Sequence, residues 1–202
     1  VARIAPGETI TLECRDAAGG HYTPQSTAAD IARMDPDAVN PVTGPLFVDG
    51  AEPGDALKVS IVDLAPSGFG WSALIPGFGL LADQFPDPHL QLWHYDRAAR
   101  EPALLGAHAR VPLKPFVGTI GLAPAAPGRH AIIPPRRVGG NMDVRDLAAG
   151  SELILPVEVE GALLSAGDTH AAQGDGEVCG TAIESAMRSE EHTSELQSLL
   201  II

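Results

Sequence analysis

The chain is patterned mainly for β-strands, because apolar and polar residues alternate along much of it. The alternation is clearest in residues 55–64 and 151–160, where apolar side chains occupy every second position and would line one face of a sheet. Residues 8–14 repeat the pattern near the start of the chain. Because proline cannot donate a hydrogen bond to a neighbouring strand, Pro156 places the strand over residues 151–160 at a sheet edge or a bulge.

Weaker patterns complete the predicted elements. Five further strands are expected, over residues 46–49, 107–113, 117–122, 161–166 and 177–183. Residues 26–34 predict a short helix capped by Ser26 or Thr27, and residues 143–149 predict one helical turn. Residues 66–88 are rich in glycine, proline and aromatic side chains, and predict an ordered loop that lines a pocket or an oligomer contact.

The composition supports many short strands and a small-molecule partner. The 202 residues include 22 glycines and 18 prolines, and only 4% are aromatic, which disfavours long helices. The formal net charge is −13, and the basic residues form no cluster beyond Arg136-Arg137. Nucleic acid and anionic membranes require clustered lysine and arginine, so neither is an expected partner. Cys14 and Cys179 are too few for a disulfide framework, which agrees with a reducing, cytoplasmic compartment.

We expect the domain to be truncated at both ends. The chain starts at Val1 and enters a strand almost at once, so an initiating methionine and a targeting peptide could lie upstream. Residues 188–198 resemble the in-frame translation of a common sequencing adapter, and the alternative is a natural amphipathic C-terminal helix. The expected organisation is a partial domain over residues 1–187 and a non-native tail over residues 188–202.

The run from Gly167 to Gly180 gathers the densest chemistry of the chain. It places Asp168, His170, Asp175 and Glu177 close together between glycines. In an extended chain, residues two apart lie on one face, so Asp168 and His170 could share a metal ion or form an acid–base pair. The alternative is a polar hairpin with the two aspartates as turn residues and His170 bonded to a backbone carbonyl.

Other reactive residues fit structural roles at least as well. Cys179 is expected on a strand, on the same face as Glu177, either as a nucleophile or as a packed thiol. His94 either contacts a substrate or is a partly buried structural histidine, and His21 is either a ligand or a turn cap.

Several blocks together point to one family. They are the sequences of residues 139–143, 155–157 and 161–177, supported by residues 16–20, 40–45, 48–55, 76–81 and 115–124. Over nearly all of residues 1–187 the chain resembles the acetamidase/formamidase family of metal-associated amide hydrolases. The resemblance implies a mainly β fold, with a β-sandwich-like core, short helices and α/β additions. It also implies self-association into a homo-oligomer, and members that are longer at both ends.

The resemblance and the residue chemistry together imply metal-assisted hydrolysis of short linear amides to carboxylate and ammonia. Asp143, Asp168 and His170 are the expected ligands of a divalent metal ion, zinc or alternatively calcium. A metal held in this way lowers the pKa of bound water and polarises the amide carbonyl.

The remaining site residues are assigned to proton transfer and charge stabilisation. Glu177 is the expected general base, and Asp175 is the reserve for the base or for a ligand. Asn141 is expected to donate to the developing oxyanion. Two alternatives stay open: hydrolysis of a cyclic amide such as a lactam, and a non-catalytic β-sandwich binding module that holds a structural cation.

Overall fold

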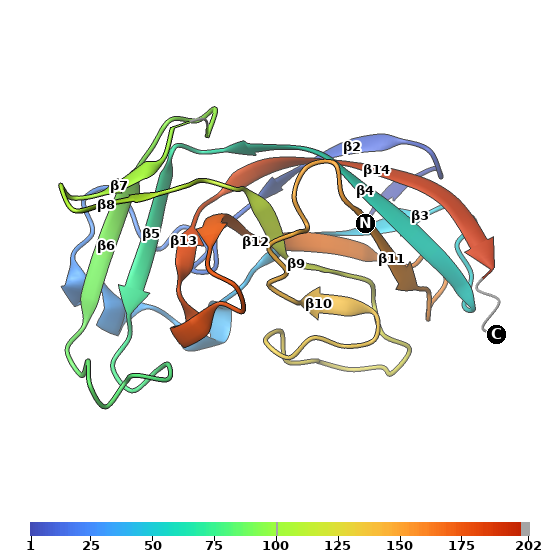
Figure 1. The fold of residues 1–202 in the computed structure, drawn as a ribbon. Helices are drawn as coiled ribbons and strands as arrows, with labels where there is room; N and C mark the ends of the chain where they lie inside the picture. Colours follow the sequence, from blue (N-terminus) through green and yellow to red (C-terminus); the bar gives the residue numbers. More distant parts are fainter. Residues whose placement is uncertain (100, 199–202) are drawn as a thin grey trace.

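The computed structural model describes residues 1–99 and 101–198, and these are built mainly of β-strands (Figure 1). The strands are β1 (Ala2–Ile4), β2 (Thr9–Cys14), β3 (Val42–Val48), β4 (Asp55–Pro66), β5 (Phe69–Leu74), β6 (His89–His94), β7 (Ala103–Leu105), β8 (Ala109–Val111), β9 (Phe116–Gly121), β10 (Gly139–Asn141), β11 (Glu152–Pro156), β12 (Leu164–Gln173), β13 (Ala182–Glu184) and β14 (Met187–Ser198). Three short 3₁₀ helices accompany them: η1 (Ala28–Arg33), η2 (Pro36–Ala38) and η3 (Val178–Gly180). The predicted mainly β class with short helices is confirmed.

Helices play a small part in this structure. Within the described ranges no residue is in an α-helix, so the implied α/β additions are not found there. Over the same ranges, no helix has the length and apolar character needed to cross a bilayer.

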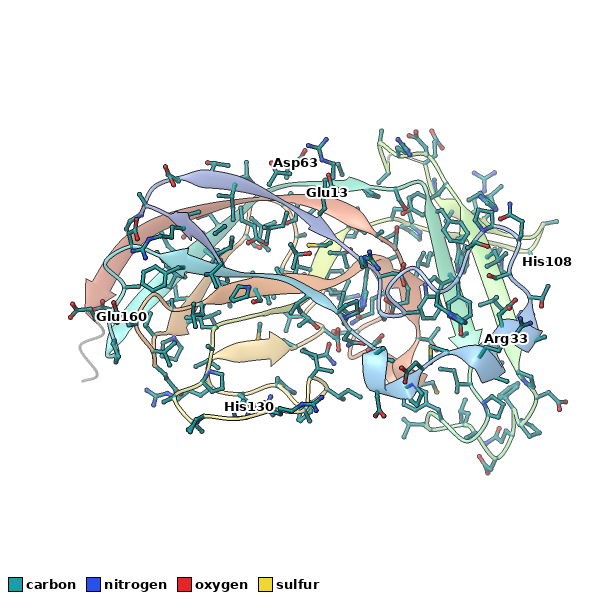
Figure 2. All side chains as sticks on the ribbon, turned by 180° about the vertical axis from the view of Figure 1, so that it is seen from behind. Glu13, Arg33, Asp63, His108, His130 and Glu160 are labelled. Atoms are coloured by element: carbon teal, nitrogen blue, oxygen red, sulfur yellow. The ribbon has the colours of Figure 1, made fainter. Side chains whose placement is uncertain are left out.

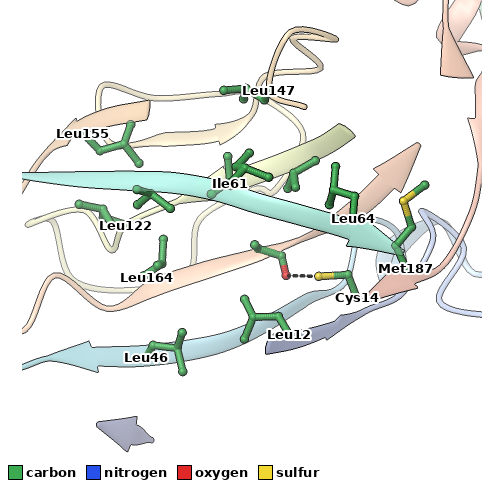
Figure 3. Packing of buried hydrophobic residues seen from close by; sticks show 14 of the residues in the cluster. Leu12, Cys14, Leu46, Ile61, Leu64, Leu122, Leu147, Leu155, Leu164 and Met187 are labelled. Carbon is green, nitrogen blue, oxygen red and sulfur yellow. Dashed lines mark hydrogen bonds between the residues drawn. The ribbon is translucent and has the colours of Figure 1, made fainter. Parts of the chain in front are cut away.

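Two sheets pack face to face and enclose the main core. One has the strand order β1-β3-β12-β13-β5-β6, with β9 paired to β12 and β10 paired to β9; the other has the order β11-β4-β14-β2. Buried side chains from both sheets form one cluster, including Val59 and Ile61 of β4, Val117 and Ile120 of β9, and Leu164 of β12. Figure 3 shows this packing between β4 and β12. The arrangement is that of a β-sandwich, as expected.

The clearest alternation patterns are confirmed as strands. β2 and β4 cover the segments predicted near residues 8–14 and 55–64, and β11 covers the first part of residues 151–160. β11 pairs with β4 and ends the strand order of its sheet, so Pro156 lies on an edge strand as predicted. The short helix predicted over residues 26–34 is η1, with Thr27 as its cap.

Three predictions of local structure are wrong. Residues 66–88 are not one loop, because β5 lies within them and pairs with β13 and β6. Residues 143–149 form a turn rather than a helical turn. Residues 177–183 are mostly η3 and its flanks rather than a strand, and β13 begins only at Ala182. In each case glycine, or pairing with a distant segment, outweighs the local pattern.

The segment from Met187 to Ser198 is a strand and not an amphipathic helix. β14 lies between β4 and β2 in the four-stranded sheet. Glu191 is fully buried there, opposite Ile61 of β4 and Ile10 of β2. Its Oε2 has no hydrogen-bond partner among the described residues, and Ser189 Oγ donates to its Oε1 over 3.4 Å. Burial raises the pKa of Glu191 to about 7.

The burial of Glu191 predicts a stability that falls as pH rises. Because the pKa is raised in the folded state, the stability is fully present below the ordinary value of 4.5 and is lost as pH rises through about 7. Glu191→Gln should raise the free energy of unfolding at pH 8 by roughly 2–3 kcal/mol and flatten its dependence between pH 5 and pH 8. Urea denaturation at both pH values measures this, with exposed Glu160→Gln as the control. Equal pH slopes in the wild type and Glu191→Gln would contradict the prediction.

Candidate active site

Strand β12 places Asp168 and His170 together inside the eight-stranded sheet. Both side chains are about 1% exposed. Asp168 has a positive φ of 50°, and a bulge follows His170, so the strand is irregular at this point. His170 Nε2 lies 3.2 Å from Asp168 Oδ1, which confirms the expected contact between carboxylate and imidazole.

Glu184 completes this contact from the neighbouring strand. In the antiparallel pairing of β12 with β13, Glu184 lies directly opposite His170, and its Oε1 is 3.2 Å from His170 Nε2. The strand predicted over residues 177–183 ends one residue before Glu184, so the predicted site does not include it. The sequence does contain one indication of this pairing. Residues 170 and 184 are equally distant from the centre of the glycine-flanked turn over residues 174–180, so a hairpin centred on that turn would pair them.

Two more carboxylates approach from loops. Asp143 follows β10, and its backbone N–H donates to Gly118 O over 3.1 Å. Glu177 caps the N-terminus of η3 in a left-handed conformation and lines a cavity at the site. The ligand atoms of Asp143, Asp168 and His170 lie within 4.8 Å of one another, and so do those of His170, Glu177 and Glu184. We call these five residues the acid–histidine cluster.

Left-handed backbone is concentrated at the site. Eight non-glycine residues of the described chain have positive φ, and Asn40, Asp143, Asp168 and Glu177 are four of them. Asparagine and aspartate tolerate this conformation, whereas for glutamate it is strained. Strained backbone persists only where the surrounding structure fixes it, and it often marks a functional site.

Asp175 lies outside the acid–histidine cluster. Its side chain is 86% exposed and makes an ion pair of 3.7 Å with Arg145. The reason is its place near the tip of the turn between β12 and η3, where its neighbours are Gly174 and Gly176. Asn141, by contrast, lines the cavity together with Asp168.

The other reactive residues are also away from the cluster. His21 Nε2 lies 2.9 Å from the backbone oxygen of Asp30 and contacts the η1 region, and the ring of His94 packs at 5.5 Å from Phe69. Cys179 lies in η3 with a positive φ, so the expected strand face shared with Glu177 is wrong. Figure 2 shows His108 and His130 at the periphery of the molecule.

A polar network orients Asp168 and Asn141. Asp168 Oδ2 accepts hydrogen bonds from Asn40 Nδ2 at 2.8 Å and from Thr119 Oγ1 at 3.1 Å. Asn141 Oδ1 accepts from the same two groups, from Asn40 Nδ2 at 3.2 Å and from Thr119 Oγ1 at 2.9 Å. The oxygen of Asn141 is therefore engaged, which leaves its amide N–H groups available to a ligand. Neither Asn40 nor Thr119 is among the predicted site residues, although Asn40 begins residues 40–45, one of the segments that resemble the family.

Gln173 fixes the orientation of His170. The Nε2 group of Gln173 donates to the backbone oxygen of Asp143 over 2.9 Å, so its Oε1 accepts from His170 Nδ1 at the same distance. The proton on Nδ1 directs Nε2 of His170 toward the carboxylates. Gln173 was also missed, because nothing in a sequence shows which side chain a buried imidazole meets.

The pKa values of the cluster reflect buried negative charge. Burial, and then the charge of Asp143, raises the pKa of Glu177 to about 8, and burial raises that of Glu184 to about 7. Burial and the charge of Asp168 also raise the pKa of Asp143. Burial alone would lower the pKa of His170, but the carboxylates of Glu184 and Asp168 outweigh it and raise the value well above 6.5. The cluster therefore favours a cation, either a proton or a metal ion.

The residues present fit a divalent metal ion. Asp143 Oδ1 is buried and has no hydrogen-bond partner among the described residues, which is costly unless a cation engages it. Gly118 leaves the space that this oxygen occupies, since a Cβ there would lie 2.9 Å from Asp143 Oδ1 and 2.5 Å from the backbone oxygen of Asp168. Oxygen and imidazole donors at this spacing suit zinc, and oxygen-rich sets suit calcium.

The acid–histidine cluster borders a cavity of about 400 Å³. Asp168, Glu177 and Glu184 line it, together with Asn40 and Asn141. A cavity with a few converging polar groups and perturbed pKa values is the usual form of a small-molecule site.

Fold and site together define a β-sandwich protein with a buried carboxylate–imidazole cluster beside a small-molecule cavity. Residues 1–132 and 125–190 match the model of the acetamidase/formamidase family. The chain belongs to this family, which confirms the resemblance found in the sequence.

Named relatives and solved structures agree with this assignment. The chain is 33% identical over 240 residues to an acetamidase of Mycolicibacterium smegmatis, covering 89% of the chain and 59% of the relative. It superimposes on an acetamidase from Bacillus halodurans with a TM-score of 0.90 at 33% identity, covering 98% and 65% of the two chains. A gamma lactamase from Delftia acidovorans gives 0.85 at 28% identity, covering 97% and 61%. The chain thus spans less than two thirds of these relatives.

The space at Gly118 yields a prediction on stability. Gly118→Ala should lower the free energy of unfolding by roughly 1–3 kcal/mol, because the new methyl group meets backbone and cluster atoms that cannot move apart cheaply. Gly174→Ala is the matched control, since a Cβ there meets nothing within 4 Å. Chemical denaturation of the wild type and both variants measures the effect, and equal stability of the two variants would refute it.

Proposed function

We propose that the protein hydrolyses the C–N bond of short linear amides, of the acetamide and formamide type, to a carboxylate and ammonia. The observation that carries the proposal is the acid–histidine cluster at the wall of a small-molecule cavity. Membership of the acetamidase/formamidase family supports it, as do relatives named acetamidase and formamidase.

Glu177 is the proposed general base. It lines the cavity, and its pKa of about 8 is close to neutrality, where a group both accepts and returns a proton efficiently. It would take the proton of the attacking water and deliver it to the nitrogen of the leaving amine. Asn141 would donate from its amide N–H groups to the carbonyl oxygen as negative charge develops there.

We assign a divalent cation to Asp143, Asp168 and His170, zinc being the first choice and calcium the alternative. The unpartnered oxygen of Asp143 supports the assignment, and so does the orientation that Gln173 imposes on His170. Such a cation lowers the pKa of a bound water and polarises the amide carbonyl. Glu184 holds His170 in place from β13, and the Asn40–Thr119 network holds Asp168.

A second candidate is the hydrolysis of a cyclic amide. The similarity to a gamma lactamase favours it, because that protein has the same fold at a TM-score of 0.85. A linear primary amide releases ammonia, whereas a lactam yields an amino acid and no ammonia, so product analysis separates the two. A binding module with a structural cation would release neither product.

We also propose a homo-oligomer in the cytoplasm that binds no nucleic acid. Exposed apolar side chains at Phe78, Leu80 and Phe85 support self-association. The net charge of −13 disfavours nucleic acid.

Substitution of the proposed base tests the mechanism. Glu177→Gln keeps the shape of the side chain but cannot accept the proton, so kcat for acetamide should fall by about 10²–10⁴-fold. Asp175→Asn changes a carboxylate in the same turn that is exposed and outside the cluster, and should leave kcat unchanged. Ammonia release under saturating substrate measures both. Wild-type turnover by Glu177→Gln would remove Glu177 from the mechanism.

Metal removal tests the cation site. Dialysis against a chelator should abolish activity, and adding back zinc or calcium should restore it and identify the ion. Asp143→Asn should lower metal content per chain, because a neutral amide is a poorer ligand for a divalent cation. Elemental analysis of the wild type, of Asp143→Asn and of Asp175→Asn gives the comparison. Active wild-type protein with no stoichiometric divalent ion would refute the assignment.

A further inference from the structure

The cavity beside the acid–histidine cluster has a second, apolar side. Its volume of about 400 Å³ is much larger than acetamide, which has only four non-hydrogen atoms. Met34, Trp71, Ala73 and Ile75 line it in addition to the cluster residues. The cavity is therefore polar where the cluster borders it and apolar along β5 and the segment that follows η1.

The apolar wall is a packed part of the structure. Tyr22, Ile31 and Trp71 form a hydrophobic cluster separate from the main core, and Met34, Ala73 and Ile75 pack against it. Trp71 is 6% exposed, and its ring centroid lies 4.5 Å from that of Tyr22. Residues held in this way present a fixed surface to a ligand.

Strand pairing sets the distance between the acid–histidine cluster and the apolar wall of the cavity. His170 of β12 lies opposite Glu184 of β13, and Glu184 lies opposite Trp71 of β5. Residues paired across antiparallel strands project to the same face of the sheet. Because neighbouring strands are about 4.8 Å apart, the backbones of His170 and Trp71 are separated by roughly 10 Å. Glu184 lies between them and lines the cavity, so an acyl chain whose carbonyl lies at the cluster would pass Glu184 before it reaches the wall at Trp71, a path long enough for several methylene groups.

The charged residues that line the cavity restrict which acyl groups can bind there. Its lining within the described chain contains three carboxylates, from Asp168, Glu177 and Glu184, and no lysine or arginine. A negatively charged acyl group would meet like charge without a partner. A polar acyl group would lose its hydration against Met34, Ala73 and Ile75, and the only help at Trp71 among the described residues would come from its buried, unpaired Nε1. The wall therefore suits an uncharged hydrocarbon chain.

We propose that, among linear amides, this site selects primary amides with an unbranched apolar acyl group of about four to six carbons over formamide and acetamide. This inference rests on the proposed amidase function. Each buried methylene contributes about 0.8 kcal/mol, a factor of about fourfold. Because the acyl chain is only partly enclosed, we expect kcat/KM for hexanamide to exceed that for acetamide by at least tenfold.

The test compares formamide, acetamide, butyramide and hexanamide with the wild type and with Ala73→Leu. The larger side chain reduces the apolar end of the cavity, so the ratio of kcat/KM for hexanamide to that for acetamide should fall at least fivefold. Ala109→Leu is the matched control, because Ala109 is an exposed residue of β8 outside the cavity, and its ratio should equal that of the wild type. If Ala73→Leu does not fold, Ile75→Ala replaces it, and loss of wall contact should lower the same ratio.

The outcomes separate the inference from the function it rests on. If the wild type hydrolyses amides but its kcat/KM for hexanamide does not exceed that for acetamide, the inference is wrong and the proposed amidase function is unaffected. If no amide is hydrolysed, the proposed function fails, and calorimetric binding of hexanamide and acetamide decides the inference on its own. Tighter binding of hexanamide, weakened by Ala73→Leu, supports it, whereas equal binding or none overturns it.

Discussion

The burial of several carboxylates around one imidazole is the constraint on which this structure depends. Removing like charges from water is costly, and this cost raises the pKa values of Glu177, Glu184 and Asp143. Protonation of the carboxyl groups or of His170 relieves this cost, because each added proton reduces the buried negative charge.

The β-sandwich supplies the rigidity that such a cluster needs. β12 lies between β3, β9 and β13, and its buried residues join a core shared by both sheets. Asp143, Asp168 and Glu177 adopt left-handed backbone conformations on this sandwich, and the conformation is strained at Glu177. Packing of the sandwich therefore compensates for local strain at the site, and Gly118 provides the space in which two of the cluster groups meet.

The acid–histidine cluster and the apolar wall of the cavity come from neighbouring strands of one sheet. β12 and β13 carry His170 and Glu184, while β5, the next strand, carries the apolar wall at Trp71. Glu184 and Trp71 are paired directly across β13 and β5, so the cluster and the wall meet at this pair. Proteins named acetamidase and gamma lactamase share this fold.

The alternation of apolar and polar residues was enough to predict the mainly β class and the longest strands, because a period of two is a local property of the chain. It also suggested that Asp168 and His170 lie close together, but the actual contact forms with Asp168 outside the extended conformation, at a φ of 50°. The sequence also determined the family. The contacts around Asp168 and His170 are visible only in the folded chain: Glu184 faces His170, Gln173 orients the imidazole, Asn40 and Thr119 hold Asp168, and Asp175 faces away. These contacts depend on strand register and on left-handed turns, which arise from packing between residues distant in sequence and leave no periodic signal.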